Sequence, residues 1–128
     1  MTRGDKETPG RQTEQWVDLL DAAQKSINNN RNDEVENTFC HELMELGLLN
    51  EPLLCKLISD IKLLTAHSTD NTHFRSIKWI ILNTMRCITS HFNKSDLYKI
   101  KNLDEEMYTK WSNEYFEEFK EILLNLDS

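Results

Sequence analysis

The chain has 128 residues and a formal net charge of −7 at pH 7. This length fits one domain, which can bury roughly two-thirds of its unfolded surface without a disulfide or a metal. The acidic balance argues against bulk nucleic-acid binding, and three scattered cysteines (Cys40, Cys55 and Cys87) do not suggest a secreted disulfide framework. No apolar run approaches the about 20 residues of a membrane span. We therefore expect an intracellular protein, cytoplasmic or nuclear, with no membrane partner.

The stretch from Leu53 to Ser128 contains no glycine and no proline. Both residues break helices, and glycine supplies the positive φ angles that tight turns between strands require. Apolar residues recur in this stretch every three or four positions, which is the period of a helix with one buried face. The sequence therefore predicts an all-α fold, a single-domain globular bundle of five to six helices joined by short loops.

The N-terminal segment 1–12 is polar and holds two of the three glycines. It has nothing to bury, so we expect a disordered N-terminal tail, with the helical domain covering 13–128. A first helix is predicted from Thr13 to Ile27, because Trp16, Leu20, Ala23 and Ile27 share one stripe. The turn-forming residues 28–33 predict a loop after it.

Two further helices are predicted in the first half of the chain. One runs from Glu34 to Leu46 and ends at Gly47, where a left-handed cap is favoured. The next is capped by Asn50 and tolerates Pro52 in its first turn. Its apolar residues form one inward stripe, namely Leu54, Leu57, Ile58, Ile61 and Leu64.

The second half predicts two long helices. One runs from His73 to Phe92, and a short helix or turn over Ser95 to Lys101 follows it. The last helix is capped by Asp104 and carries acids in its first turn, where the helix dipole favours them. The expected core residues of the helix 73–92 are Phe74, Ile77, Ile81, Met85, Ile88 and Phe92, with Ile80 and Cys87 at the edge. Those of the last helix are Tyr108, Trp111, Tyr115, Phe119, Ile122 and Leu126.

No motif in the sequence indicates catalysis. A Gly-rich phosphate loop, a GxSxG elbow and an HExxH pair are all missing from the chain, so we predict a protein that is not an enzyme and uses no cofactor. Cys87 and His91 lie four residues apart and would supply half of a zinc site. No second ligand pair accompanies them, and a buried thiol beside a hydrogen-bonded histidine is the alternative interpretation. We therefore predict no metal site.

Charge is distributed unevenly along the chain. Residues 65–102 hold six basic and two acidic side chains, whereas the segments before and after them are both acidic. Successive residues of a helix are rotated by about 100° around its axis, which places the basic residues of the helix 73–92 opposite its core stripe. A tryptophan and a leucine lie on the same side as these basic residues. These residues are the predicted partner-binding set: Arg75, Lys78, Trp79, Leu82 and Arg86.

Tryptophan and arginine are enriched in binding hot spots, and arginine can stack on tryptophan. We therefore predict a protein–protein interaction module, an adaptor or regulator, whose partner is an acidic protein or a second copy in a homodimer. The small size and the Asn-, Ile- and Lys-rich composition are typical of a viral protein. Two structural alternatives remain: the helix is central and wrapped on both sides, with arginine stems over its neighbours, or the acidic last helix covers the basic face.

The alternative function comes from a different class. The basic middle segment 75–101 would serve an accessory factor of a nucleic-acid or ribonucleoprotein complex. Salt-dependent binding to RNA or DNA would favour this alternative over a protein partner.

Overall fold

The computed structural model describes residues 9–32, 34–67 and 71–126. Its helices are α1 (Pro9–Arg31), α2 (Phe39–Glu45), α3 (Glu51–His67), α4 (Phe74–Phe92), α5 (Glu105–Lys110) and α6 (Phe116–Leu126). A 3₁₀ turn over Asn71–His73 leads into α4, and a π turn over Trp111–Tyr115 joins α5 to α6. The described residues contain no strand, so the predicted single helical domain of the all-α class is confirmed.

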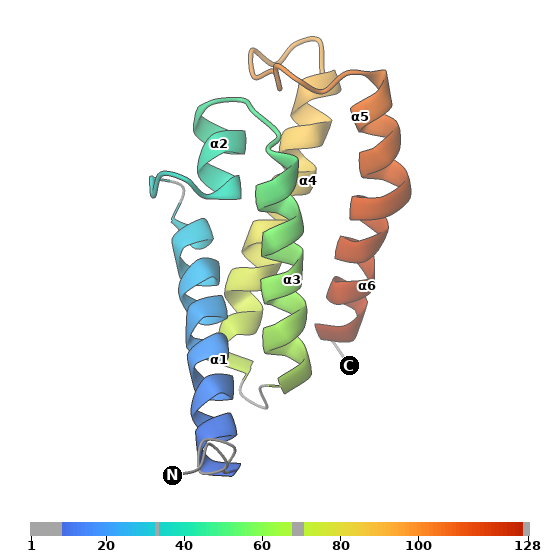
Figure 1. The fold of residues 1–128 in the computed structure, drawn as a ribbon. Helices are drawn as coiled ribbons and strands as arrows, with labels where there is room; N and C mark the ends of the chain where they lie inside the picture. The colour runs from blue at the N-terminus through green and yellow to red at the C-terminus, as the bar shows by residue number, and fades with distance from the viewer. Residues whose placement is uncertain (1–8, 33, 68–70, 127–128) are drawn as a thin grey trace.

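The long helices form a bundle in which α1 and α4 run in one direction and α3 and α5–α6 in the other (Figure 1). Helix α1 packs against both α3 and α4, and α6 packs against the same two helices from the other side. The short helix α2 lies beyond the C-terminal end of α1 and packs on α4. One flank of α4 is therefore covered by α1 and α2, and the other by α6.

This arrangement sets which face of α4 is buried. The buried residues are Ile77, Ile80, Ile81, Thr84, Cys87 and Ile88. The predicted core stripe was correct at its centre and wrong at one edge, because Phe92 is 55% exposed and Met85 is only partly buried. Because α1 and α2 pack on that flank of α4, its buried face is centred closer to Ile80 and Cys87 than the predicted stripe was. Thr84 is tolerated there because its hydroxyl donates a hydrogen bond to the carbonyl oxygen of Ile80 at 2.8 Å.

Helix α1 is longer than predicted at both ends. It begins at Pro9, so residues 9–12, which were expected in the tail, are helical; proline suits a first helical turn because it needs no backbone donor there. Residues 1–8 of the predicted tail lie outside the described residues. At the other end the helix continues to Arg31, through the segment that was predicted to be a loop.

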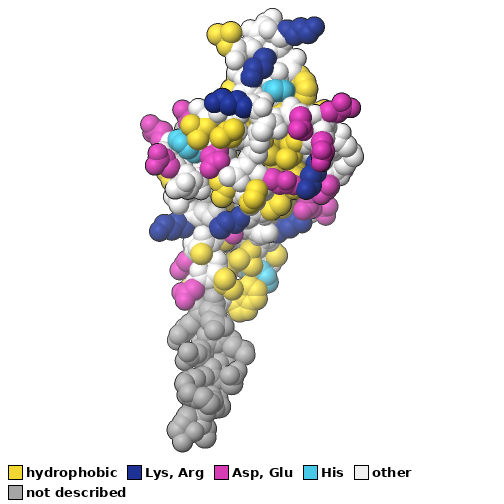
Figure 2. All heavy atoms as spheres, turned by 45° about the horizontal axis from the view of Figure 1, so that its top comes forward, with side chains coloured by type: hydrophobic (Ala, Val, Ile, Leu, Met, Phe, Trp, Pro, Cys, Tyr) yellow, Lys and Arg dark blue, Asp and Glu magenta, His cyan; other side chains and the backbone are white. Residues whose placement is uncertain are grey.

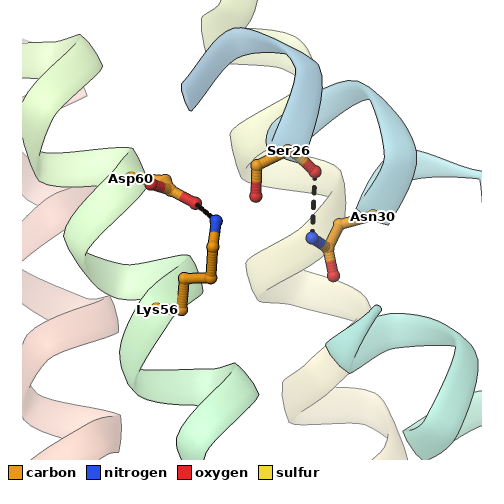
Figure 3. A network of polar contacts seen from close by, with 4 residues as sticks. All are labelled: Ser26, Asn30, Lys56 and Asp60. Atoms are coloured by element: carbon orange, nitrogen blue, oxygen red, sulfur yellow. Dashed lines mark hydrogen bonds and ion pairs between the residues drawn. The ribbon is translucent and has the colours of Figure 1, made fainter. Parts of the chain in front are cut away.

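The buried side chain of Asn30 explains this extension (Figure 3). Its Nδ2 donates to the carbonyl oxygen of Ser26 at 2.9 Å, and its Oδ1 accepts the backbone N–H of Cys40 at 3.1 Å. Asn30 therefore joins the end of α1 to the first turn of α2. The same view contains the Lys56–Asp60 ion pair at 2.8 Å on α3, and a pair of this exposed kind contributes little to stability.

Replacing Asn30 with alanine is expected to lower the free energy of unfolding by about 1–3 kcal/mol, because the buried N–H of Cys40 loses its acceptor. Urea unfolding followed by circular dichroism measures the change. The matched control is Asn28→Ala, an exposed asparagine in the same helix turn, which should leave stability unchanged or raise it slightly. Equal effects of the two substitutions would contradict the role assigned to Asn30.

The second predicted helix is shorter than expected. It was predicted from Glu34, but α2 begins at Phe39, after Thr38, whose Oγ1 accepts the N–H of His41 at 3.1 Å. Asn37 has a φ of 63°, a left-handed conformation that a continuous helix cannot contain. Residues 34–38 therefore form turns and bends where the first part of this helix was predicted.

The predicted caps at Gly47, Asn50 and Asp104 are confirmed, whereas Thr13, the predicted cap of the first helix, lies inside α1. Gly47 has a φ of 66°. Asn50 Oδ1 accepts the N–H of Leu53 at 3.2 Å, and Asp104 Oδ1 accepts the N–H of Met107 at 2.8 Å. Each of these signals is local in the sequence, which is why it could be recognised without the fold.

The π turn is tied to the start of α3. Within the turn, the N–H of Phe116 donates to the carbonyl oxygen of Trp111. The hydroxyl of Tyr115 donates to Glu51, which also pairs with Lys110. Both hydrogen bonds hold the pKa of the Glu51 carboxyl below its usual value, and the bond from Lys110 has a larger effect than the bond from Tyr115. The network fixes the last helix against α3.

Candidate partner-binding surface

The five predicted partner-binding residues lie along one side of α4, opposite its buried face. Arg75, Leu82 and Arg86 are exposed, and the Leu82 side chain retains 55% of its accessible surface. Lys78 and Trp79 are partly buried. The centre of the surface is therefore an exposed leucine between two exposed arginines.

Trp79 lies at the border between this surface and α1. The guanidinium carbon of Arg31 lies 4.5 Å from the centre of the Trp79 ring, a distance at which the cation and the ring attract each other. The ring also packs against the core. Trp79 is thus neither a fully buried core residue nor a fully exposed one. Arg31 extends the positively charged surface from α4 onto α1.

The sequence did not identify Arg31, because residues 28–33 were interpreted as a loop. Its spacing of four from Ile27, the last residue of the predicted stripe, was the available signal. Continuing the helix by one turn would have placed Arg31 on the side of α1 that carries Ala23 and Ile27, the side that faces the core.

The segment that lies against Trp79 is α1 and not the acidic last helix. Carboxylates of the last helix pair with other lysines. Glu118 forms an ion pair with Lys62 of α3 at 2.7 Å, and Glu117 pairs with Lys120 one turn away at 3.1 Å. The structure therefore favours wrapping by α1 over coverage by the last helix.

The basic middle segment 75–101 is divided between two places. Arg75 and Arg86 lie on α4, whereas Lys94 and Lys101 are exposed in the connection after it. Lys99 has a structural role: its ammonium donates to the carbonyl oxygens of His91, Asn93 and Asp96 at 3.1, 3.0 and 3.0 Å. The His91 carbonyl is in the last turn of α4 and the other two follow the helix, so Lys99 joins the C-terminal end of α4 to the turns after it.

Cys87 and His91 are occupied by structural contacts. Burial raises the pKa of the Cys87 thiol, with a smaller opposing effect from a hydrogen bond to Tyr98. The Nδ1 of His91 accepts the backbone N–H of Ile100 at 2.9 Å. Across residues 9–32, 34–67 and 71–126, no group of three or more His, Cys, Asp or Glu side chains is placed to hold a metal ion.

Within the part of the chain that the structure describes, no helix combines the length and the apolar composition needed to cross a membrane. None of the three cysteines forms a disulfide. No protein-family model, curated protein or solved structure matches this chain.

Proposed function

We propose that this protein is a non-enzymatic protein–protein interaction module, an adaptor or regulator, which binds an acidic protein partner through the outer face of α4. Leu82 carries the proposal, because it is 55% exposed between the exposed Arg75 and Arg86. Burying a leucine gains about 1.5–3 kcal/mol, and each arginine can form a paired hydrogen bond with a carboxylate.

Charge complementarity supports an acidic partner. The rest of the chain is acidic, whereas this face carries Arg75 and Arg86, with Arg31 at its border. Like charges between the face and a basic or nucleic-acid-binding protein would be unfavourable. A second copy of the chain belongs to the same class of partner, because the segment 103–128 holds eight acidic and two basic side chains.

The proposal places the protein inside the cell, in the cytoplasm or the nucleus. Three cysteines without a disulfide support a reducing compartment. The Asn-, Ile- and Lys-rich composition supports a viral protein of the adaptor class.

Reversing two charges on this face tests the proposal. We expect Arg75→Glu combined with Arg86→Glu to abolish capture of the partner in an affinity pull-down read by quantitative mass spectrometry. The free energy of unfolding should change by no more than about 0.5 kcal/mol, because both side chains are at the surface. The matched control, Lys25→Glu with Lys56→Glu, makes the same change in net charge on α1 and α3 and should leave capture intact.

Leu82→Asp provides an independent variant, since it removes the apolar centre without touching either arginine. A partner that all variants capture equally well would contradict the proposed face. Binding of the purified protein to single-stranded RNA, weakening steeply with salt and lost in the charge-reversed variant, would instead support the nucleic-acid alternative.

A further inference from the structure

The connection between α4 and α5 forms turns and no helix, and it is held rigidly by its own side chains. Asn93 Oδ1 accepts the N–H of Ser95, and Asp96 Oδ1 accepts the N–H of Tyr98, both at 2.9 Å. The Lys99 ammonium binds the carbonyl oxygen of His91 at the end of α4 and those of Asn93 and Asp96 after it. This segment, residues 93–102, is called the tip loop below.

The tip loop is also fixed to α2 and to the segment that follows it. The hydroxyl of Tyr98 donates to the carbonyl oxygen of Leu43. The N–H of Lys101 donates to the carbonyl oxygen of Gly47 at 2.7 Å. Asn102 and Leu49 exchange two hydrogen bonds of 2.8 Å, from the Leu49 N–H to Asn102 Oδ1 and from Asn102 Nδ2 to the Leu49 carbonyl. The loop therefore has one defined conformation on both sides of its centre.

The centre of this rigid loop presents an apolar side chain to water. Leu97 is 99% exposed, between Asp96 and Tyr98, which are both fixed. A mobile loop could turn a leucine inward, but here the flanking contacts hold it outward. Binding through a preorganised side chain costs little conformational entropy, so the arrangement favours a docking contact.

Basic side chains accompany this leucine. Lys94 and Lys101 of the same loop are exposed. Figure 2, in which the upper end of the bundle comes forward, shows hydrophobic and Lys or Arg side chains together at that end. It also shows acidic side chains on the side of the bundle where α5 and α6 lie, and others on the opposite side.

A groove of about 370 Å³ lies between α4 and the α5–α6 segment, below the tip loop. Its lining is mixed: Met85, Ile88, Tyr108, Trp111 and Phe116 are apolar or aromatic, and Thr89, Ser112 and Glu117 are polar. The π turn shapes this groove, because Trp111 and Phe116 are the two residues joined by its wide hydrogen bond. A widened turn of this kind is frequent at functional sites.

We propose that two copies of this chain associate by inserting Leu97 of each copy into the α4/α5–α6 groove of the other. The leucine matches the apolar part of the lining of the groove. Lys94 and Lys101 are opposite in charge to two carboxylates near the groove: Glu117, which lines it and also pairs with Lys120, and Glu105, three residues before Tyr108. Because the tip loop directly joins the two helices that form the groove, each copy can offer and accept a leucine in a closed dimer.

This interaction uses a different surface from the outer face of α4, so it does not depend on the proposed function. The wild-type protein should dimerise in sedimentation equilibrium over concentrations up to about 1 mM, the weak limit of specific association. Leu97→Asp should weaken the dimer about 100- to 10,000-fold, because each dimer then loses two buried leucines, one from each copy. Leu124→Asp is the matched control, since Leu124 is a 68% exposed leucine on α6, and it should dimerise like the wild type.

Groove variants test the other half of the contact. Ser112→Trp should fill the groove and weaken the dimer as strongly as Leu97→Asp; Thr89→Trp, at an exposed position on the α4 side, serves if the first variant does not fold. The Leu97→Asp chain keeps its groove and the Ser112→Trp chain keeps its leucine. Mixing the two should therefore form a one-to-one heterodimer in native mass spectrometry, at concentrations where neither variant self-associates.

Three outcomes would overturn the inference. The first is a wild-type protein that stays monomeric up to about 1 mM. A monomer that binds anionic phosphatidylserine vesicles through Leu97 would count as this outcome and would assign Leu97 to membrane binding. The second is a dimer that Leu97→Asp does not weaken. The third is a dimer lost with Arg75→Glu and Arg86→Glu but kept with Leu97→Asp, which would assign self-association to the α4 face and support the proposed function.

Discussion

Replacing Phe119 with alanine is expected to destabilise the protein by about 3–5 kcal/mol, a large part of the 5–15 kcal/mol that typically separates folded from unfolded domains. Phe119 is completely buried, and its ring lies 5.8 Å from that of Trp111, with the planes at 72°. The substitution removes this edge-to-face contact and leaves a cavity between α6 and its neighbours. Chemical denaturation monitored at the far-ultraviolet helix signal measures the loss.

Ile81→Ala on α4 should cost about 2–5 kcal/mol for the same reason, because this side chain is also fully buried. The matched control for both is Leu124→Ala, which truncates an exposed leucine and should change stability by less than about 0.5 kcal/mol. A loss below about 1 kcal/mol at both Phe119 and Ile81 would mean that α4 and α6 do not share the core described above.

Gly47→Ala should also destabilise the protein strongly, by at least about 2 kcal/mol. A φ of 66° costs an ordinary residue about 1–2 kcal/mol. In addition, a Cβ at this position would lie 2.7 Å from the carbonyl oxygen of Lys99, so the backbone of the tip loop would have to move. Thermal and urea unfolding measure the effect.

Asn37 separates these two causes, because it has a similar φ of 63° and is exposed. Asn37→Ala carries only the conformational strain and should cost about 1 kcal/mol or less, since asparagine itself tolerates this region better than alanine. Gly47→Ala should therefore be clearly the more damaging of the two. Equal costs would indicate that the tip loop moves freely away from Gly47, against the rigidity on which the dimer proposal depends.

The sequence predicted the features that depend on nearby residues. The cap at Asn50, the left-handed end at Gly47 and five of the six predicted core positions of the last helix are confirmed. The sixth was wrong, because Tyr108 is 40% exposed. Each confirmed feature follows from residue types within one or two helical turns. The all-α class followed in the same way from the spacing of apolar residues and the missing glycine and proline.

The features that it failed to predict depend on distant contacts. Asn30 was interpreted as a turn former, because its helical state depends on the N–H of Cys40, ten residues later. The exposure of Phe92 depends on which helices flank α4. For the candidate site, spacing placed Arg75, Leu82 and Arg86 on one face, but it could not show that Arg31 covers one side of Trp79.

Leu97 was outside the predicted sites altogether. Nothing in its sequence neighbourhood distinguishes a leucine that packs inward from one held in water. The difference arises from contacts with Leu43, Gly47 and Leu49, which lie about fifty residues earlier in the chain.

The π turn has a consequence for how this chain should be aligned with others. Met107, Trp111, Tyr115 and Phe119 follow one another at spacings of four, and three such steps in a regular α-helix rotate a residue by about 120°. The turn over Trp111–Tyr115 holds one residue more than a regular turn and removes this drift. A relative lacking one residue between Trp111 and Tyr115 could present the same inward side chains from an unbroken α-helix. A gap placed at this turn would therefore keep α6 in register, whereas an ungapped alignment would shift each of its buried residues by one position.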